Sequence, residues 1–239
     1  MNNDNIMNID TTVHQLDEFE FQANSTYTLL SARKSGKSFL IRNLCYLLLK
    51  RQLIDVIYLI SYTADVDKAY TSWIAPEYII NPKNMDKSID LLFKVQKSLG
   101  DKAKKICIIF DDFDMTTQSN SIDVLYTRGR HYQITTILSA QITTKGVSTA
   151  IRNNTQYLFI RKLNSKTLKE NVFNMLLNSE FDNGNDFYKF VKDHNEDYAF
   201  ILYFCDDRPS NESLKLVKAS EKKFKFEYTP TKKEKKDRL

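Results

Sequence analysis

The chain has 239 residues, of which 42% are hydrophobic, and it carries a formal net charge of +5. This length allows one domain with a sizeable core and, at most, a small appendage. Its three cysteines and three histidines lack metal-ligand spacing, which argues against a zinc site, and no Ser/His/Asp hydrolase context is present. No apolar run approaches the roughly 20 residues that cross a bilayer, so no membrane partner is expected.

The N-terminal segment lacks the basic and apolar parts of a signal peptide. Cys45, Cys107 and Cys205 lie far apart in apolar segments, which predicts free thiols in a reducing, cytosol-like compartment. Within an extended lead-in at residues 1–22, Phe19 and Phe21 alternate with acids in the pattern of an edge strand.

The first chemical motif is Ser-Ala-Arg-Lys-Ser-Gly-Lys-Ser at residues 31–38, between an apolar run and a helical pattern at 39–49. This is the strand–loop–helix context of a phosphate-binding P-loop, in which backbone N–H groups and a helix N-terminus surround the phosphates. The Lys37 side chain would reach the β- and γ-phosphates of ATP, and the Ser38 hydroxyl would hold Mg²⁺. The candidate nucleotide-binding residues are Ser31, Ala32, Arg33, Lys34, Ser35, Gly36, Lys37 and Ser38.

The loop departs from the usual pattern in one place, because Ser31 stands where a glycine is expected and Gly36 is its only glycine. Positive φ angles would then fall on residues such as Lys34 or Ser35, at a conformational cost. A Ser/Lys-rich turn before an ordinary helix is the alternative interpretation.

Two carboxylates follow the next informative strand. The apolar run at residues 106–110 predicts a strand buried on both faces of a parallel sheet, and Asp111 and Asp112 come directly after it. The carboxyl ends of such strands form the rim at which α/β proteins bind ligands. We assign Asp111 to Mg²⁺, as a Walker B carboxylate, and Asp112 to the attacking water. The alternative is an acidic turn that ends a strand.

A third strand, at residues 134–141, ends in Gln141. We expect it between the P-loop strand and the Walker B strand, where Gln141 would sense the γ-phosphate or position water. Further strands are predicted at residues 55–61, 157–160 and 198–204, and helices at residues 85–99, 121–126, 165–177 and 186–192, with an irregular stretch at 62–84. Alternating strands and helices predict an α/β protein with a parallel sheet.

Basic charge is concentrated at the C-terminus. Residues 221–239 have a surplus of four positive charges, so the remaining chain carries about +1. This composition predicts a disordered tail that either contacts nucleic acid through its phosphates or only aids solubility. The expected organisation is an N-terminal lead-in at 1–22, a P-loop ATPase domain at 23–220 and the basic tail.

Four motifs in this order resemble one known family. After the P-loop and the two carboxylates come Arg-Gly-Arg-His-Tyr at residues 128–132, the strand ending in Gln141, and Ile-Arg-Asn-Asn at residues 151–154. This arrangement resembles the viral DNA-packaging ATPases of the FtsK–HerA superfamily, of the poxvirus-like type found across large DNA viruses and virophages. The resemblance covers residues 27–163.

The resemblance implies a RecA-like core, with a mostly parallel central sheet flanked by helices. It also implies a P-loop ATPase that converts ATP and water to ADP and phosphate, with Mg²⁺, and moves double-stranded DNA into a preformed capsid. Its implied partners are DNA, other copies in a homo-oligomeric ring, and the capsid or its portal vertex. Its implied location is the host cytoplasm (the virus factory), with the virion as a second location.

Ring ATPases often complete each site with an arginine from the neighbouring subunit, and Arg128, Arg130 and Arg152 are the candidates here. The second Walker B residue of the family is often Glu, so Asp112 would act through a water. Two alternatives remain open: a conjugation-type or helicase-like DNA translocase, and a weakly ATP-binding nucleic-acid or scaffold protein.

Overall fold

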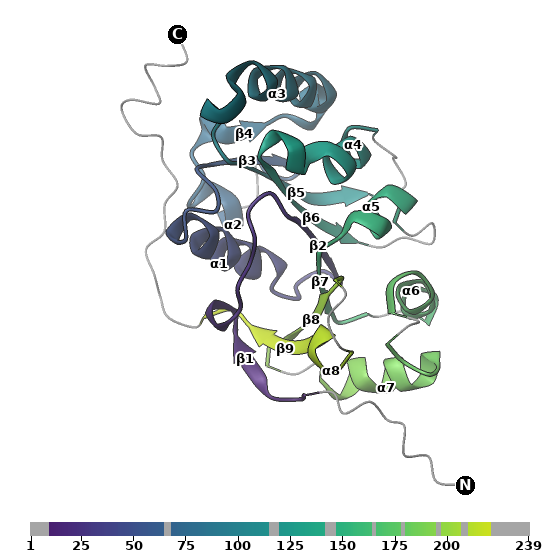
Figure 1. The fold of residues 1–239 in the computed structure, drawn as a ribbon. Helices are drawn as coiled ribbons and strands as arrows, with labels where there is room; N and C mark the ends of the chain where they lie inside the picture. The colour runs from purple at the N-terminus through teal and green to yellow at the C-terminus, as the bar shows by residue number, and fades with distance from the viewer. Residues whose placement is uncertain are drawn as a thin grey trace, which may run out of the picture.

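The computed structural model describes residues 10–64, 68–114, 120–141, 147–163, 166–177, 180–194, 197–206 and 210–220. The first nine residues and the basic tail predicted at 221–239 therefore lie outside the described residues. Within the described ranges the chain forms a nine-stranded sheet with helices on both faces (Figure 1). The strands are β1 (Val13–Gln15), β2 (Thr26–Ser31), β3 (Val56–Ser61), β4 (Ile79–Ile80), β5 (Ile106–Asp114), β6 (Ile134–Gln141), β7 (Tyr157–Arg161), β8 (Phe200–Phe204) and β9 (Leu214–Lys218).

The strand order is β1-β9-β8-β7-β2-β6-β5-β3-β4. From β7 to β4 every neighbouring pair is parallel, which agrees with the predicted parallel sheet. β6 pairs with β2 on one side and with β5 on the other, as expected for the strand between the P-loop and the Walker B carboxylates. The carboxyl ends of these three strands therefore meet at one edge of the sheet.

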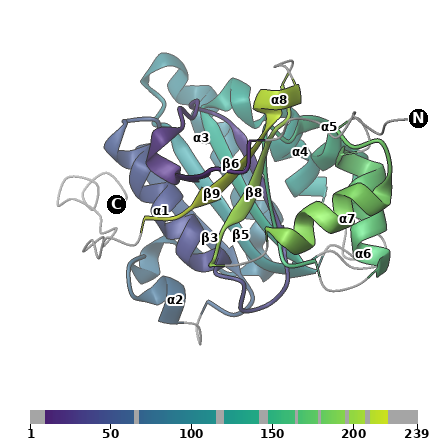
Figure 2. The same ribbon diagram turned by 90° about the horizontal axis from the view of Figure 1, so that it is seen from below.

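The central strands are buried on both faces, and their side chains alternate between two cores. On β5, Cys107 and Ile109 belong to one hydrophobic cluster, whereas Ile108 and Phe110 belong to the other. Helices α1 and α2 cover the first cluster, and the helices from α3 to α7 cover the second (Figures 1 and 2). The helices are α1 (Lys37–Lys50), α2 (Lys68–Thr71), α3 (Met85–Leu99), α4 (Asn120–Arg128), α5 (Thr149–Asn154), α6 (Lys166–Val172), α7 (Gly184–Asp193) and α8 (Ser210–Ser213).

Short helices complete the connections. A π-helix, η6 (Phe173–Leu177), continues α6, so the helix predicted at 165–177 is present in two forms. The 3₁₀-helices are η1 (Leu16–Glu18), η2 (Pro76–Tyr78), η3 (Pro82–Asn84), η4 (Gly100–Lys102) and η5 (Gly129–Tyr132). Gly100 follows the last residue of α3 and has a φ of 53°, in a region that favours glycine.

The side of the sheet that contains β1 and β8 differs from the predictions. The edge strand β1 lies at Val13–Gln15, and the predicted strand pattern around Phe19 and Phe21 was wrong because Phe21 is instead buried against Tyr27 and Tyr157. The last predicted strand begins at Phe200 and runs antiparallel to β7 and β9.

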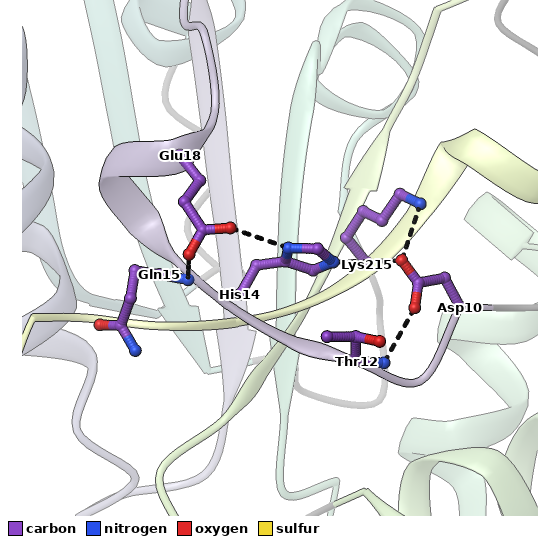
Figure 3. A network of polar contacts seen from close by, with 6 residues as sticks. All are labelled: Asp10, Thr12, His14, Gln15, Glu18 and Lys215. Carbon is purple, nitrogen blue, oxygen red and sulfur yellow. Dashed lines mark hydrogen bonds and ion pairs between the residues drawn. The ribbon is translucent and has the colours of Figure 1, made fainter.

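A polar network fastens β1 to β9 (Figure 3). The two ring nitrogens of His14 lie 2.9 Å from Glu18 Oε2 and 3.1 Å from Asp10 Oδ2, and Lys215 of β9 lies 3.2 Å from the same Asp10 oxygen. The two carboxylates raise the pKa of His14. The Thr12 backbone N–H, followed by His14, lowers the pKa of Asp10. A charged network therefore joins the N-terminal strand to the last described strand.

Cys45 and Cys107 are buried free thiols, as predicted, whereas Cys205 is half-buried. Among the described residues, no helix has the length and apolar character needed to cross a membrane.

Candidate nucleotide-binding site

The candidate site lies where β2, β6 and β5 end. The P-loop runs from the end of β2 into α1, and β6 lies between β2 and β5. Asp111 and Asp112 lie in the last part of β5, which continues to Asp114 and not only to the predicted residue 110. Motifs about 75 residues apart in the chain are thus brought together by parallel pairing at one edge of the sheet.

The loop geometry explains how Ser31 replaces the usual glycine. Ser31 is the last residue of β2 and lacks a positive φ; within the loop only Lys34 (57°) and Gly36 (92°) have one. The expectation of a strained φ is met at Lys34 and not at Ser35. The Ser31 and Ser35 hydroxyls lie 2.7 Å apart and both side chains are buried, so the extra serine side chain closes the loop with a hydrogen bond.

Lys37 is held inside this loop at the start of α1. Its ammonium group donates to the carbonyl oxygens of Ser31 and Ala32, each at 3.1 Å, and the side chain is buried. Burial lowers the pKa of Lys37, and the charges of Asp111 and Asp112 oppose this shift.

Asp111 is almost fully buried at the end of β5, in register with Ser61 on β3 and Ser139 on β6. Burial raises the pKa of its carboxyl group, and the nearby hydroxyls of Ser139 and Tyr70 and the charge of Lys37 oppose the shift. Its Oδ1 atom forms no hydrogen bond within the described residues. A buried carboxylate oxygen without a partner is a group that a metal ion would satisfy.

The Asp112 side chain has a different direction from that of Asp111. The reason is an irregularity in β5 between Asp111 and Phe113, where Asp112 has a φ of 55°. Its Oδ2 accepts a hydrogen bond of 3.0 Å from the hydroxyl of Thr63, beyond the end of β3. A bulge of this kind re-aims a side chain. The two neighbouring carboxylates therefore have separate environments, one buried and one at the rim.

Tyr70 is a site residue that the sequence interpretation missed. It is fully buried on the short helix α2, within the stretch expected to be irregular. Burial and the neighbouring Asp111 carboxylate raise the pKa of Tyr70, and the hydroxyl of Ser38 opposes the shift. Its phenol therefore lies beside both residues assigned to Mg²⁺. No signal in the sequence distinguishes Tyr70 from an ordinary core tyrosine.

Arg161, at the end of β7, is a second residue that was missed. Its guanidinium group donates to the carbonyl oxygen of Ser35 and thereby supports the P-loop from the neighbouring strand. The same group lies 4.7 Å from the centre of the Tyr198 ring. An arginine at a strand end is a recognisable signal, but the pairing of β7 with β2 was needed to give it a position.

The remaining candidate residues are Gln141 and three arginines, and none of them takes part in the contacts described above. Gln141 is the last residue of β6, with its backbone opposite Asp114, and the structure describes nothing of its side chain. Arg128 and Arg130 are exposed, and Arg152 is half-buried. Arg130 donates to His131 at 3.5 Å and Arg152 donates to Asn153 at 3.3 Å, and neither partner is a P-loop residue. Within the described ranges, no cluster of three or more His, Cys, Asp or Glu side chains forms a metal site of its own.

The fold resembles solved structures of NTPases. The genome packaging NTPase B204 from Sulfolobus turreted icosahedral virus 2, in complex with ATP-gammaS, has a TM-score of 0.59 at 18% identity, over 82% of this chain and 97% of that chain. The pCW3 conjugation coupling protein TcpA, with ATPgS, has a TM-score of 0.54 at 15% identity, over 81% of this chain and 59% of that chain. At these identities the likeness establishes the mixed α/β fold.

Sequence relatives narrow the assignment. Uncharacterized protein 075L of Invertebrate iridescent virus 6 is 30% identical over 168 residues, which cover 66% of this chain. The chain spans 62% of the length of that relative. The family described as Poxvirus A32 protein matches residues 18–208, a range that contains the P-loop, both aspartates and β6. The chain belongs to the Poxvirus A32 protein family.

Proposed function

We propose that this protein is an ATP-hydrolysing motor that moves double-stranded viral DNA into a preformed capsid. The observation that carries the proposal is that parallel pairing brings the P-loop with Lys37 and the carboxylates of Asp111 and Asp112 to the same edge of the sheet, in a chain of the Poxvirus A32 protein family. A cation and two carboxylates at the end of parallel strands suit a metal-bound triphosphate.

The residues present fit ATP and Mg²⁺. The loop from Ser31 to Ser38 offers its backbone N–H groups and the N-terminus of α1 to the phosphates. Ser38 and the buried carboxylate of Asp111 would hold the ion, whose charge would satisfy the Asp111 oxygen that lacks a partner. Bound Mg²⁺ would supply charge neutralisation of the phosphate oxygens. Lys37 would exchange its carbonyl partners for phosphate oxygens, which are stronger acceptors.

Asp112 and Gln141 would manage the water. The bulge holds the Asp112 carboxylate at the rim, where it would accept a proton from, or orient, the attacking water. Gln141 ends the strand between the P-loop and Asp112 and would sense the γ-phosphate. Arg128, Arg130 and Arg152 are candidates for completing the site of a neighbouring copy in a homo-oligomeric ring.

The proposed work and partners rest on the relatives. B204 is described as a genome packaging NTPase and as a DNA-packaging ATPase of its virus. By analogy, the partners of this chain would be double-stranded DNA, further copies of itself, and the capsid or its portal vertex. The work would take place in the host cytoplasm at the virus factory, and the protein would also be found with the virion.

Steady-state ATP hydrolysis, with and without linear double-stranded DNA, tests the proposal in the wild type and in Lys37→Ala. We expect turnover that DNA stimulates and that the variant loses, together with loss of genome encapsidation in infected cells. Absence of turnover in the wild type, at concentrations that allow assembly, together with normal encapsidation by Lys37→Ala, would refute the motor.

A second candidate is a conjugation-type DNA translocase, and the similarity to the coupling protein TcpA favours it. The same site would serve both functions, so ATPase assays cannot separate them. Capsids that form but stay empty of DNA in a Lys37→Ala infection would support packaging, whereas full capsids with active wild-type enzyme would support the other translocase.

A non-catalytic nucleic-acid or scaffold protein is the third alternative. A ligand at 100 times its Kd should stabilise the folded protein by about 2.7 kcal/mol. A melting temperature that ATP and Mg²⁺ do not raise would therefore favour this alternative over either motor.

A further inference from the structure

An exposed aromatic ring stands at the edge of the P-loop. Tyr198 is 66% exposed, which makes it the most exposed large apolar or aromatic side chain in the described part of the chain. It precedes β8, two strands away from β2 in the sheet order. A tyrosine in this position needs an explanation, because a ring that served only to fill space beside the loop would be buried.

The ring is held against the loop by two contacts. The Tyr198 Cδ1 atom lies 3.1 Å from the place that a Cβ atom would take at Gly36, so the ring approaches the glycine closely. The guanidinium carbon of Arg161 lies 4.7 Å from the ring centre, and the same group donates to the carbonyl oxygen of Ser35. Arg161 therefore links the ring to the backbone that would surround the phosphates.

The backbone at this position is unusual. Asp197 and Tyr198 have φ angles of 49° and 59°, a region that a bulky side chain rarely adopts. The strain places the ring next to Gly36 instead of in the core. Strain that is maintained at the border of a ligand site is a reason to look for a role in binding.

The chemistry of the expected ligand supplies that role. A nucleoside triphosphate whose phosphates lie on the P-loop extends its ribose and base away from Lys37 along the surface. A base needs a flat, partly apolar surface, and aromatic side chains provide such a surface for any base. Because Arg161 lies against one face of the Tyr198 ring, the opposite face is available for stacking.

We propose that Tyr198 is the stacking surface for the nucleobase of the bound nucleotide and that Arg161 holds the ring in place. This proposal rests on the proposed ATP site and adds a subsite to it. The subsite would bind the base of a nucleoside triphosphate and would contribute nothing to the binding of a triphosphate that has no base.

The test compares two ligands in the presence of Mg²⁺, ATP-gammaS and inorganic tripolyphosphate, by calorimetry on the full chain. Tyr198→Ala should weaken ATP-gammaS binding about 5- to 150-fold, the range measured when a stacking side chain is removed, and leave tripolyphosphate affinity unchanged. Tyr198→Phe should bind both ligands as the wild type does. Tyr198→Leu keeps bulk beside Gly36 without an aromatic face and should behave as Tyr198→Ala does.

Leu91→Ala is the matched control, since Leu91 is 61% exposed on α3, and it should change neither affinity. Unchanged ATP-gammaS binding by Tyr198→Ala would overturn the subsite while leaving the ATP site intact. Equal loss of both ligands in Tyr198→Ala and Tyr198→Leu would also overturn it, because the ring would then be only a structural part of the P-loop. If the wild type binds neither ligand, the ATP site itself fails and the subsite falls with it.

Discussion

At the scale of single residues, the two neighbouring aspartates have different surroundings and should have different roles. Asp111 is buried beside Tyr70, whereas Asp112 is turned toward Thr63. Asp111→Asn should weaken Mg²⁺-dependent ATP binding by at least about 100-fold, because it removes a charge from a metal ligand. Asp112→Asn should leave binding unchanged and slow hydrolysis about 10²- to 10⁴-fold, the usual contribution of a general base.

Equilibrium binding and single-turnover hydrolysis measure the two effects separately. Circular dichroism of both variants provides the control for folding. An Asp112→Asn protein that hydrolyses ATP at the wild-type rate would show that the water is activated by another group.

Gly36 is required both for its backbone conformation and for its lack of a side chain. Its φ is 92°, and a Cβ atom would lie 3.1 Å from Tyr198. Gly100→Ala is the matched control, since Gly100 also has a positive φ but would place its Cβ atom in open space. Gly100→Ala should lower stability by about 1–3 kcal/mol through the backbone alone and retain ATP binding.

Gly36→Ala should cost at least as much stability and also lose ATP binding, because the P-loop or the Tyr198 ring must shift. Denaturant unfolding and calorimetry with ATP-gammaS measure both quantities. Adding Tyr198→Ala should recover part of the lost stability of Gly36→Ala; no recovery would show that the close contact does not limit the fit.

At the scale of elements, local sequence patterns predicted the strands and helices whose formation depends mainly on neighbouring residues. Apolar runs of β-branched residues predicted β5 and β6, and the Gly-Lys-Ser segment predicted the start of α1. The residues missed are those whose roles depend on pairing between distant strands. Arg161 reaches the P-loop only because β7 lies beside β2, and Tyr70 reaches Asp111 only because the helix α2 packs across the sheet.

The same reason explains the errors on the β1 side of the sheet. The pairing of β1 with β9 joins segments some 200 residues apart, and the antiparallel direction of β8 is set by its pairing with β7, more than 40 residues earlier. Neither pairing leaves a periodicity in the segments themselves. Short edge strands also carry weak patterns, since β1 has three residues and β4 has two.

The contact between β1 and β9 should depend on pH. Asp10 and Glu18 raise the pKa of His14 above its ordinary 6.5, so the stabilisation from protonated His14 is fully present below about pH 6.5 and is lost as the pH rises through the raised value. The lowered pKa of Asp10 gives stabilisation above its ordinary 3.8 that is lost only in stronger acid. Lys215 is the remaining charged partner in this network.

Hydrogen exchange of the β1 amides, corrected for intrinsic rates, should therefore be slowest between about pH 4 and 6.5 and become faster toward pH 9. The amides of β5 provide an internal reference. His14→Asn should remove the change above pH 6.5, and a wild-type profile without that change would show that His14 does not hold β1 in place.

At the scale of the whole molecule, the P-loop site lies where β2, β6 and β5 end, whereas the three candidate arginines lie on other elements. Arg128 is the last residue of α4, Arg130 lies in η5 and Arg152 lies in α5. An arginine supplied by a neighbouring copy would complete the site across the interface between two copies. Such an arginine is worth about 10³- to 10⁵-fold in rate.

Mixing experiments with inactive variants identify that arginine. Lys37→Ala has a defective P-loop but a complete set of arginines, whereas an arginine variant has an intact P-loop. If Arg152 acts in the neighbouring site, Arg152→Ala alone should lose about 10³-fold in ATP turnover, and mixing it with Lys37→Ala should restore activity at mixed interfaces. The same test applies to Arg128→Ala and Arg130→Ala. Restored activity requires assembly, so it should be lost on dilution. If the mixtures of Lys37→Ala with each of the three arginine variants all stay inactive, none of the three arginines is the shared residue.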